Sequence, residues 1–190
     1  MEDTLYEAPH VDFSLQFGFA KNDERVEARL YEVLKDIATE IVEGVKENLG
    51  ALVVLGDFSQ NYGKLSGAVQ MKPKQSPVDD LITVDDDNVA EIISQFSEAP
   101  FDGAIVVDKT GQIIGAGIYL IVDDPTLDTP EDCGTRHKAA ASFSLRSDVI
   151  SVLTLSEETN TIRIWRDGKQ AEVHKVKPMV KETSDEQDSV

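Results

Sequence analysis

An amphipathic segment followed at once by a wholly apolar one most constrains how this chain can fold. From Asp23 to about Gly50, apolar residues recur at helical spacing. They are Val26, Leu30, Val33, Leu34, Ile37, Ile41 and Val45. Residues 51–56 then form a short apolar run that a glycine closes. Because a strand without polar alternation has both faces covered, the sequence predicts a helix and then a central strand of an α/β sheet.

The same two periodicities predict the remaining elements. Strands are expected at 81–84, 104–107, 113–122, 149–155, 161–165 and 169–174, and a helix at 134–146. Hairpin turns join the strands that are adjacent in sequence, most clearly at Asp108-Lys109-Thr110-Gly111. Residues 57–80 and 123–133 are polar connectors. The fold class expected is therefore α/β, with a mixed central sheet flanked by helices.

An acidic triplet, Asp85-Asp86-Asp87, precedes a further helical pattern. That pattern places Val89, Ile92, Ile93 and Phe96 on one face. Carboxylates stabilise a helix N-terminus without any ligand, so we expect the triplet to cap this helix and prefer that interpretation to a metal site.

The chain of 190 residues suits one domain with short extensions. We expect an irregular N-terminal arm at 1–22, in which the alternating apolar residues Phe13, Leu15, Phe17 and Phe19 could form an edge strand. The folded domain is expected at 23–177, and a disordered acidic tail at 178–190. No internal repeat is detected.

A formal net charge of −18 argues against nucleic acid or an anionic membrane as a partner, because both would be repelled. The sequence has no basic leader and no long apolar segment, so we expect a protein without a membrane anchor. Cys133 is the only cysteine, which excludes an intrachain disulfide and a cysteine zinc cluster. A reducing, cytoplasmic setting is therefore expected.

A basic turn, Gly134-Thr135-Arg136-His137-Lys138, leads into an alanine-rich helical segment. Cations at a helix N-terminus oppose the helix dipole, so this turn suggests a bound anion such as phosphate. A basic first turn that is merely solvated is the alternative. Neighbouring helical residues point in different directions, so His137 should not face the same way as Arg136 and Lys138.

Two other polar clusters, Asp102-Gly103-Ala104 and Ser156-Glu157-Glu158, also lie at the ends of predicted elements, where α/β sheets place ligand groups. Taken alone, the first could be a plain Asp-Gly turn and the second a solvated hairpin connection. Taken together, their carboxylates could hold a hard divalent cation that polarises a phosphoryl group. A hydrolase triad of Ser142, His137 and Asp102 has no support in its spacing.

The first two of these clusters in chain order, Asp102-Gly103-Ala104 and Gly134-Thr135-Arg136-His137-Lys138, resemble the signatures of the diadenylate cyclase domain family. These signatures are an Asp-Gly-Ala motif and an Arg-His-Arg motif preceded by Gly-Thr, and the third cluster, Ser156-Glu157-Glu158, follows them in support. The resemblance covers roughly residues 25 to 175. It implies a mixed α/β domain that condenses two ATP molecules into cyclic di-AMP and releases two pyrophosphates. It also implies Mg²⁺ or Mn²⁺ as cofactor, and an active site formed between two facing domains of a homodimer or higher homo-oligomer.

The resemblance also implies roles for single residues. Asp102 matches the aspartate that binds metal and helps to activate the ribose 3′-hydroxyl for attack on the partner's α-phosphorus, and Glu157 looks like the second acidic metal ligand. Arg136 and His137 are expected in the catalytic set. The residues expected to contact ATP are Gly103, Ala104, Gly134, Thr135, Arg136, His137, Lys138 and Ser156.

One departure from the family pattern concerns Lys138, which stands where the motif usually has a second arginine. Lysine offers a point charge in place of a bidentate fork. This difference favours a second hypothesis, a nucleotide-binding module of the same fold that acts as a sensor or silent subunit. A third hypothesis, an acidic interaction protein, predicts no ATP binding. The membrane helices and the further helical domain of some family members have no counterpart in this sequence, so we expect a soluble cyclase domain or an excised one.

Overall fold

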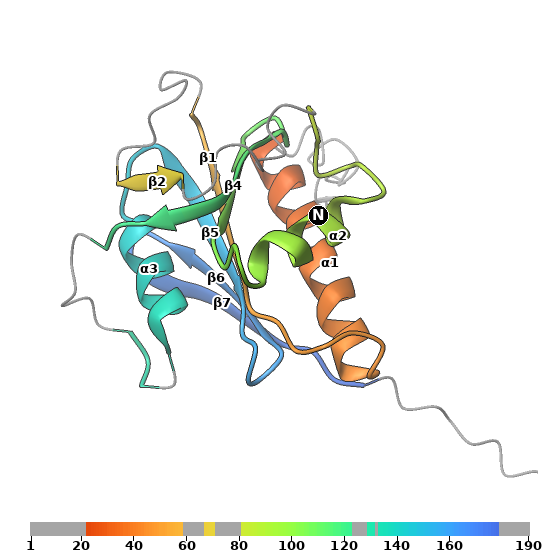
Figure 1. Ribbon diagram of the computed structural model, residues 1–190. Coiled ribbons are helices and arrows are strands. Elements are labelled where there is room, and N and C mark those ends of the chain that lie inside the picture. Colours follow the sequence, from red (N-terminus) through yellow and green to blue (C-terminus); the bar gives the residue numbers. More distant parts are fainter. Residues whose placement is uncertain (1–21, 59–66, 71–80, 123–128, 132, 179–190) are drawn as a thin grey trace, which may run out of the picture.

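The structure is a computed structural model that describes residues 22–58, 67–70, 81–122, 129–131 and 133–178 (Figure 1). The predicted arm except Asn22, and most of the tail and of both connectors, lie outside these residues. The elements in chain order are α1 Asn22–Val42, β1 Ala51–Gly56, β2 Ala68–Gln70, α2 Val89–Ser97, β3 Ala104–Asp108, β4 Ile113–Leu120, α3 Thr135–Phe143, β5 Val149–Leu155, β6 Thr161–Arg166 and β7 Lys169–Lys175.

In the described part of the chain, seven strands form one sheet in the order β2-β4-β3-β1-β5-β6-β7. Strands β1 and β3 are parallel, and every other neighbouring pair is antiparallel. The sheet is therefore mixed, and β1 lies at its centre, as the apolar run predicts. The α/β class expected from the sequence is confirmed.

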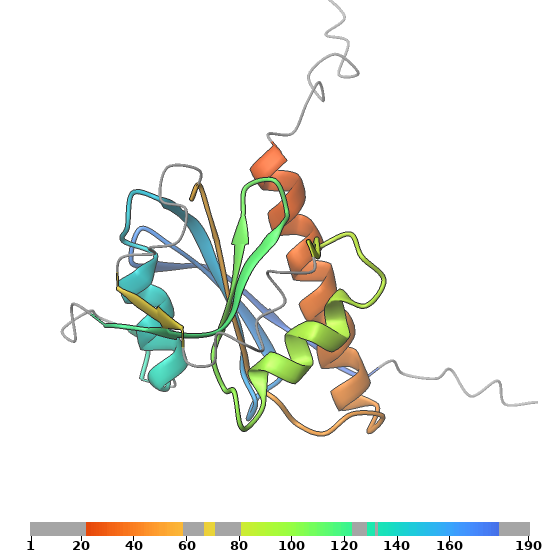
Figure 2. The same cartoon turned by 45° about the horizontal axis from the view of Figure 1, so that its top comes forward.

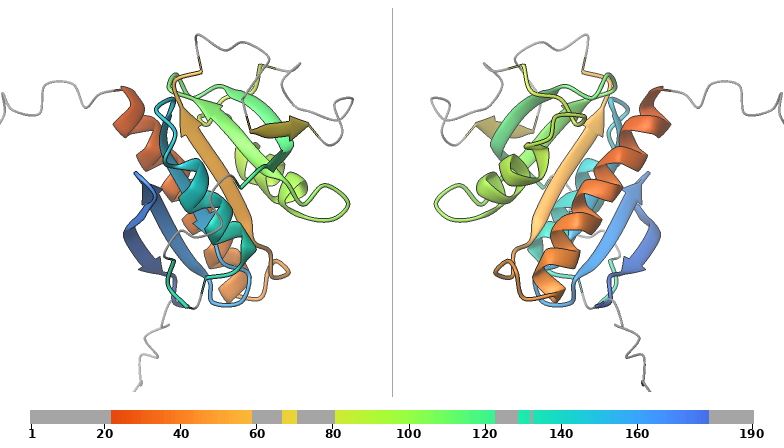
Figure 3. Two further views of the ribbon diagram at one scale, coloured as in Figure 1. Left: turned by 90° about the vertical axis from the view of Figure 1, so that its left-hand side faces the viewer. Right: turned by 90° about the vertical axis from the view of Figure 1, so that its right-hand side faces the viewer.

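Helices cover both faces of the sheet. Helices α1 and α2 lie on one face and α3 on the other, as the two opposite views of Figure 3 show. Along β1 the side chains divide accordingly: Val53 and Leu55 pack in the core beneath α1 and α2, whereas Leu52 and Val54 pack beneath α3. Double coverage thus accounts for the absence of polar alternation in β1. None of the described helices has the length and apolar character needed to cross a membrane.

Helix α1 ends earlier than the sequence pattern predicts. Gly44 adopts a left-handed φ of 73°, and its N–H donates to the carbonyl of Ile41 at 3.0 Å, while the N–H of Val45 donates to the carbonyl of Glu40 at 2.8 Å. These two bonds form a Schellman cap, which ends a helix at a glycine. Val45 is consequently 74% exposed and lies outside the apolar stripe assigned to it.

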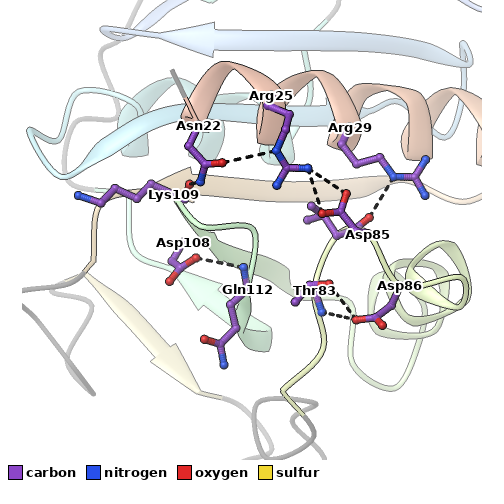
Figure 4. Close-up of polar contacts among 10 residues, drawn as sticks. Asn22, Arg25, Arg29, Thr83, Asp85, Asp86, Asp108, Lys109 and Gln112 are labelled. Carbon is purple, nitrogen blue, oxygen red and sulfur yellow. Dashed lines mark hydrogen bonds and ion pairs between the residues drawn. The ribbon is translucent and has the colours of Figure 1, made fainter. Parts of the chain in front are cut away.

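The strand predicted at 81–84 is wrong. In the structure this segment forms one isolated bridge, between Thr83 and Gln112 of the β3–β4 hairpin. Two backbone hydrogen bonds flank this bridge: the N–H of Val84 donates to the carbonyl of Gly111, and the N–H of Ile113 donates to the carbonyl of Ile82, each at 2.8 Å. Within the segment, the Asp86 carboxylate accepts hydrogen bonds from the backbone N–H and the hydroxyl of Thr83 at 2.6 and 3.0 Å (Figure 4). Those bonds lower the pKa of the Asp86 carboxyl below its usual value.

The capping role predicted for the acidic triplet is also wrong. The N-cap of α2 is Asn88, and no side-chain cap bond forms there. Asp85 instead accepts two hydrogen bonds from the guanidinium of Arg25 on α1, and Arg29 of the same helix donates to the carbonyl of Val84 (Figure 4). These contacts tie the first turns of α1 to the segment before α2.

Strands β3 and β4 form the antiparallel hairpin that the sequence predicts, and the register of this pair shifts along β4. Gly117 has a left-handed φ of 67°, typical of a β-bulge. Ala116 packs beneath α1 and α2, whereas Ile118 and Leu120 pack beneath α3, so the irregularity switches the buried face. Figure 2 shows β4 curving from the side of α1 towards α3. There it pairs with β2, a strand missed within the predicted connector 57–80.

Candidate functional site

The three polar clusters that the sequence separates by tens of residues line one pocket of about 620 Å³. Asp102, Gly103 and Ala104 contribute the start of β3, Gly134 to His137 the start of α3, and Ser156 to Glu158 the turn after β5. The apolar wall comprises Leu52, Ile118, Leu120, Val122, Ala139 and Leu155. Because β1 is parallel to β3 and antiparallel to β5, the pocket lies where β1 and β3 begin and β5 ends.

Arg136 bridges the other two clusters. Its Nη2 donates to Oδ1 of Asp102 at 2.5 Å, and its Nη1 donates to Oε2 of Glu157 at 3.4 Å. The Arg136 side chain is 33% exposed, and the Asp102 and Glu157 side chains are 63% and 54% exposed. The cation at the start of α3 is therefore balanced by two carboxylates of the same chain. For Arg136, these carboxylates supply the negative charge that the sequence argument assigns to a bound anion.

The turn that carries Asp102 follows α2 and has an uncommon backbone. Asp102 has a left-handed φ of 39°, and its N–H donates to the carbonyl of Glu98 at 2.9 Å. The N–H of Gly103 donates to the carbonyl of Phe96 at 3.2 Å. Aspartate tolerates this conformation better than most residues, and such strain persists where surrounding structure enforces it. The end of α2 thus fixes the place of the Asp102 carboxylate.

Gly103 is packed directly against the neighbouring strand. A Cβ atom at this position would lie 2.5 Å from the carbonyl carbon of Gly117, 2.7 Å from its Cα, and 2.7 Å from the backbone nitrogen of Ile118. Gly103, which the family resemblance gives as an ATP contact, therefore also meets a structural requirement of the sheet. Only glycine allows β3 and β4 to come this close at the pocket wall.

His137 points away from Arg136, as helical geometry predicts. Its ring is buried beneath α3, with its centroid 6.0 Å from that of Trp165. Its Nε2 lies 3.4 Å from Nη1 of Arg163, whose Nε donates to Oε1 of Gln170 at 3.0 Å. Arg163 is only 5% exposed. The sequence analysis missed this arginine, because a single cation in an alternating strand carries no local sign of burial.

Of the other residues expected to contact ATP, some line the pocket and one does not. Gly134 and Thr135 are exposed and line the pocket, and Ser156 is half-buried and lines it. Lys138 is exposed and is absent from the described pocket lining. The structure therefore brings together every predicted ATP-contacting residue except Lys138.

The pocket offers two carboxylates, Asp102 and Glu157, close to one another as potential ligands of a divalent cation. Within the described ranges, no group of three or more His, Cys, Asp or Glu residues could hold a metal ion. Asp102 and Glu157 nevertheless converge on one positive group, the guanidinium of Arg136. Mg²⁺ in nucleotide sites takes one or two carboxylates and completes its shell with phosphate oxygens and waters. These two carboxylates fit a cation that arrives with a phosphorylated substrate.

Comparison with known proteins places these residues within a family. Residues 38–170 match the family described as "DisA bacterial checkpoint controller nucleotide-binding". A crystal structure titled as a hypothetical membrane spanning protein from Bacillus cereus has a TM-score of 0.51 and 21% sequence identity, covering 80% of this chain and 63% of that one. This likeness supports the fold alone.

Curated relatives of this chain carry the name diadenylate cyclase. The protein from Methanocaldococcus jannaschii is 30% identical over 154 residues, covering 80% of this chain and 47% of its own length. The protein from Listeria monocytogenes is 27% identical over 172 residues, covering 83% of this chain and 55% of its own. The chain thus spans about half the length of the curated relatives it matches. The motifs, the pocket and the family match agree, and the chain belongs to the DisA-type nucleotide-binding family, the diadenylate cyclase domain family.

Proposed function

We propose that this chain is a diadenylate cyclase domain, which condenses two ATP molecules into cyclic di-AMP and two pyrophosphates. The observation that carries this proposal is the convergence of Asp102, Arg136 and Glu157 in one pocket at the start of α3. The named relatives support the same activity.

In this proposal, the start of α3 binds the triphosphate. The first N–H groups of a helix have no intrahelical acceptor, and together with the dipole they favour an anion. Gly134, Thr135 and Arg136 line the pocket at this helix end. Arg136 would exchange its carboxylate partners for phosphate oxygens, which a guanidinium binds with directed hydrogen bonds. His137 would hold the first turn of α3 against β6 by its contacts with Trp165 and Arg163.

Two carboxylates of the pocket, Asp102 and Glu157, would serve the metal ion and the attacking hydroxyl. Asp102 and Glu157 would hold Mg²⁺ or Mn²⁺, which supplies charge neutralisation at the triphosphate and lowers the pKa of an attacking hydroxyl. Asp102 would help to activate the ribose 3′-hydroxyl, whose oxygen loses its proton and forms the new bond to the α-phosphorus of the second ATP, while the bond from that phosphorus to pyrophosphate breaks. Positioning and charge neutralisation are the main demands of phosphoryl transfer, and this chain offers both.

The use of two ATP molecules for each cyclic di-AMP is the reason why we infer a homodimer. Cyclic di-AMP contains two 3′-to-phosphate bonds, so each ATP must supply one hydroxyl and one α-phosphorus. A pocket of about 620 Å³ is of the size that holds one small ligand. Two copies of this chain, each presenting one ATP with the pockets facing, would complete both bonds.

A second candidate function is a nucleotide-binding module that does not form the cyclic product. The observation that favours it is Lys138, which replaces the usual arginine of the motif and is exposed outside the described pocket lining. Such a module would bind ATP or cyclic di-AMP in the same pocket.

The test is incubation of the purified chain with ATP and Mn²⁺ or Mg²⁺, followed by chromatography and mass detection of cyclic di-AMP and pyrophosphate. Asp102→Asn keeps the shape and removes the charge, and we expect its turnover to fall by about a hundredfold or more. Turnover of Asp102→Asn near the unmodified level would rule out the role given to Asp102. ATP binding without product would support the module, and neither binding nor product would contradict both functions.

A further inference from the structure

We propose that Gly50 is a positioning residue for this site, an inference that rests on the proposed function. The absence of its side chain leaves the space in which the Arg136 guanidinium lies. A Cβ atom at Gly50 would be 2.1 Å from Nη1 of Arg136 and 3.0 Å from its Cζ. Real Cβ atoms do not approach other heavy atoms this closely, so a larger residue at position 50 moves Arg136.

Strand pairing explains why these two residues meet. Gly50 is buried and directly precedes β1. In the antiparallel pairing of β1 with β5, Ala51 lies opposite Leu155. Gly50 therefore lies beside the exit of β5, where Ser156 and Glu157 begin, and the side chain of Arg136 crosses this point from α3.

Gly50 is not required by its own backbone. Its φ lies outside the left-handed range that favours glycine, so alanine can adopt the same conformation. The third neighbour of a Cβ at this position, the carbonyl oxygen of Leu155, lies at 3.3 Å, which a small adjustment relieves. The atoms in severe overlap belong to the far end of one flexible side chain. Gly50→Ala should thus displace Arg136 and leave the strand in place.

The displaced atom is the one that completes the bridge. Nη1 of Arg136 donates to Glu157, while Nη2 donates to Asp102. A Cβ at Gly50 overlaps Nη1, so the contact with Glu157 is lost first. A guanidinium held in one place loses less conformational freedom when it binds phosphate. Gly50 thereby makes the phosphate-binding group of the pocket pre-organised.

The experiment compares ATP binding and turnover of Gly50→Ala, Arg136→Ala and the double variant. We expect Gly50→Ala to weaken ATP binding by about tenfold, the scale of one lost hydrogen bond to a charged group. In the Arg136→Ala background, Gly50→Ala should cause no further loss of affinity or of kcat/KM. Unchanged affinity in Gly50→Ala, or losses that multiply in the double variant, would overturn the inference.

A matched glycine provides the control. Gly44 has a left-handed φ of 73°, and a Cβ there would have no neighbour within 4 Å. Gly44→Ala should therefore lower the thermal unfolding midpoint through backbone strain and leave ATP affinity and turnover unchanged. Weaker ATP binding in Gly44→Ala would show that lost stability alone accounts for the Gly50 result, and would overturn the inference.

A second readout separates this inference from the proposed function. If the unmodified chain neither binds ATP nor makes product, the proposed function fails, yet the Gly50 contact can still be measured by thermal unfolding. Without the Arg136 side chain, the new methyl group has room, and replacing glycine by alanine restricts the unfolded chain. Gly50→Ala should then lower the thermal unfolding midpoint less, or raise it, in the Arg136→Ala background than in the unmodified chain. Equal changes in both backgrounds would contradict the contact.

Discussion

Replacing Gly103 by alanine tests the backbone contact between β3 and β4 at the pocket wall. The added Cβ would lie 2.5 Å from the carbonyl carbon of Gly117 and 2.7 Å from the nitrogen of Ile118. These are backbone atoms of a paired strand, so no side-chain rotation can relieve the overlap. Overpacking costs about 1–3 kcal/mol, and we expect about 2–3 kcal/mol here because the backbone must move. For a chain of 190 residues this lowers Tm by about 4–12 °C.

Thermal unfolding followed by circular dichroism measures this change, with Gly134→Ala as the matched control. Gly134 lines the same pocket, has a φ of −79°, and a Cβ there meets nothing within 4 Å. Its replacement weakens only a helix cap, at a cost of less than about 1 kcal/mol. If Gly103→Ala unfolds at the same temperature as the unmodified chain, or shifts no more than Gly134→Ala, the reasoning from backbone contact is refuted.

Two further predictions separate binding from stability. Arg136→Ala removes ion pairs to exposed carboxylates, so the unfolding free energy should fall by less than about 1 kcal/mol, while ATP affinity measured by calorimetry falls at least about tenfold. A stability loss of several kcal/mol would contradict this. A hydrogen bond from His174, and then one from Arg166, lowers the pKa of the Glu172 carboxyl below its ordinary 4.5 despite some burial. This stabilisation is present above pH 4.5 and is lost as pH falls through the lower folded pKa. Urea unfolding measured at several pH values in this range should show that the free energy of unfolding falls less steeply with acidification in Glu172→Gln than in the unmodified chain. Equally steep falls in the two proteins would contradict this.

The sequence predicts those elements whose signal is local. Strand β1 and the hairpins of β5, β6 and β7 follow from short apolar or alternating runs between turn residues, and the structure confirms them. The end of α1 was missed although its signal is also local, because Val45 continues the apolar stripe past Gly44. A left-handed glycine cap ends a helix whatever the spacing of the next apolar residue.

The features that the sequence predicts wrongly depend on partners that are distant along the chain. Residues 81–84 contain apolar residues of strand type, but only Thr83 finds a bridge partner, at Gln112. The acidic triplet has the composition of a helix cap, yet Asp85 is held by Arg25, 60 residues away in sequence. Composition states which hydrogen bonds a carboxylate can accept, and tertiary structure decides which donor is near.

The candidate site shows the same limit. Each cluster could be recognised in the sequence, because Asp102, Arg136 and Glu157 lie at the ends of predicted elements. Their meeting point depends on strand order: β3 and β5 both flank β1, in opposite directions, so the start of one and the end of the other share an edge. Distances of 34 and 21 residues along the chain give no indication of this edge.

Three glycines of this chain show how far a local argument can reach. Gly44 is explained by its own φ, which a sequence pattern can suggest. Gly103 is explained by the backbone of a neighbouring strand, which requires the sheet register. Gly50 has a φ outside the left-handed range, so its explanation is the group that occupies the place of its side chain, the Arg136 guanidinium. A residue can therefore shape a binding site through the volume that it leaves empty, and only the packed structure identifies which residue that is.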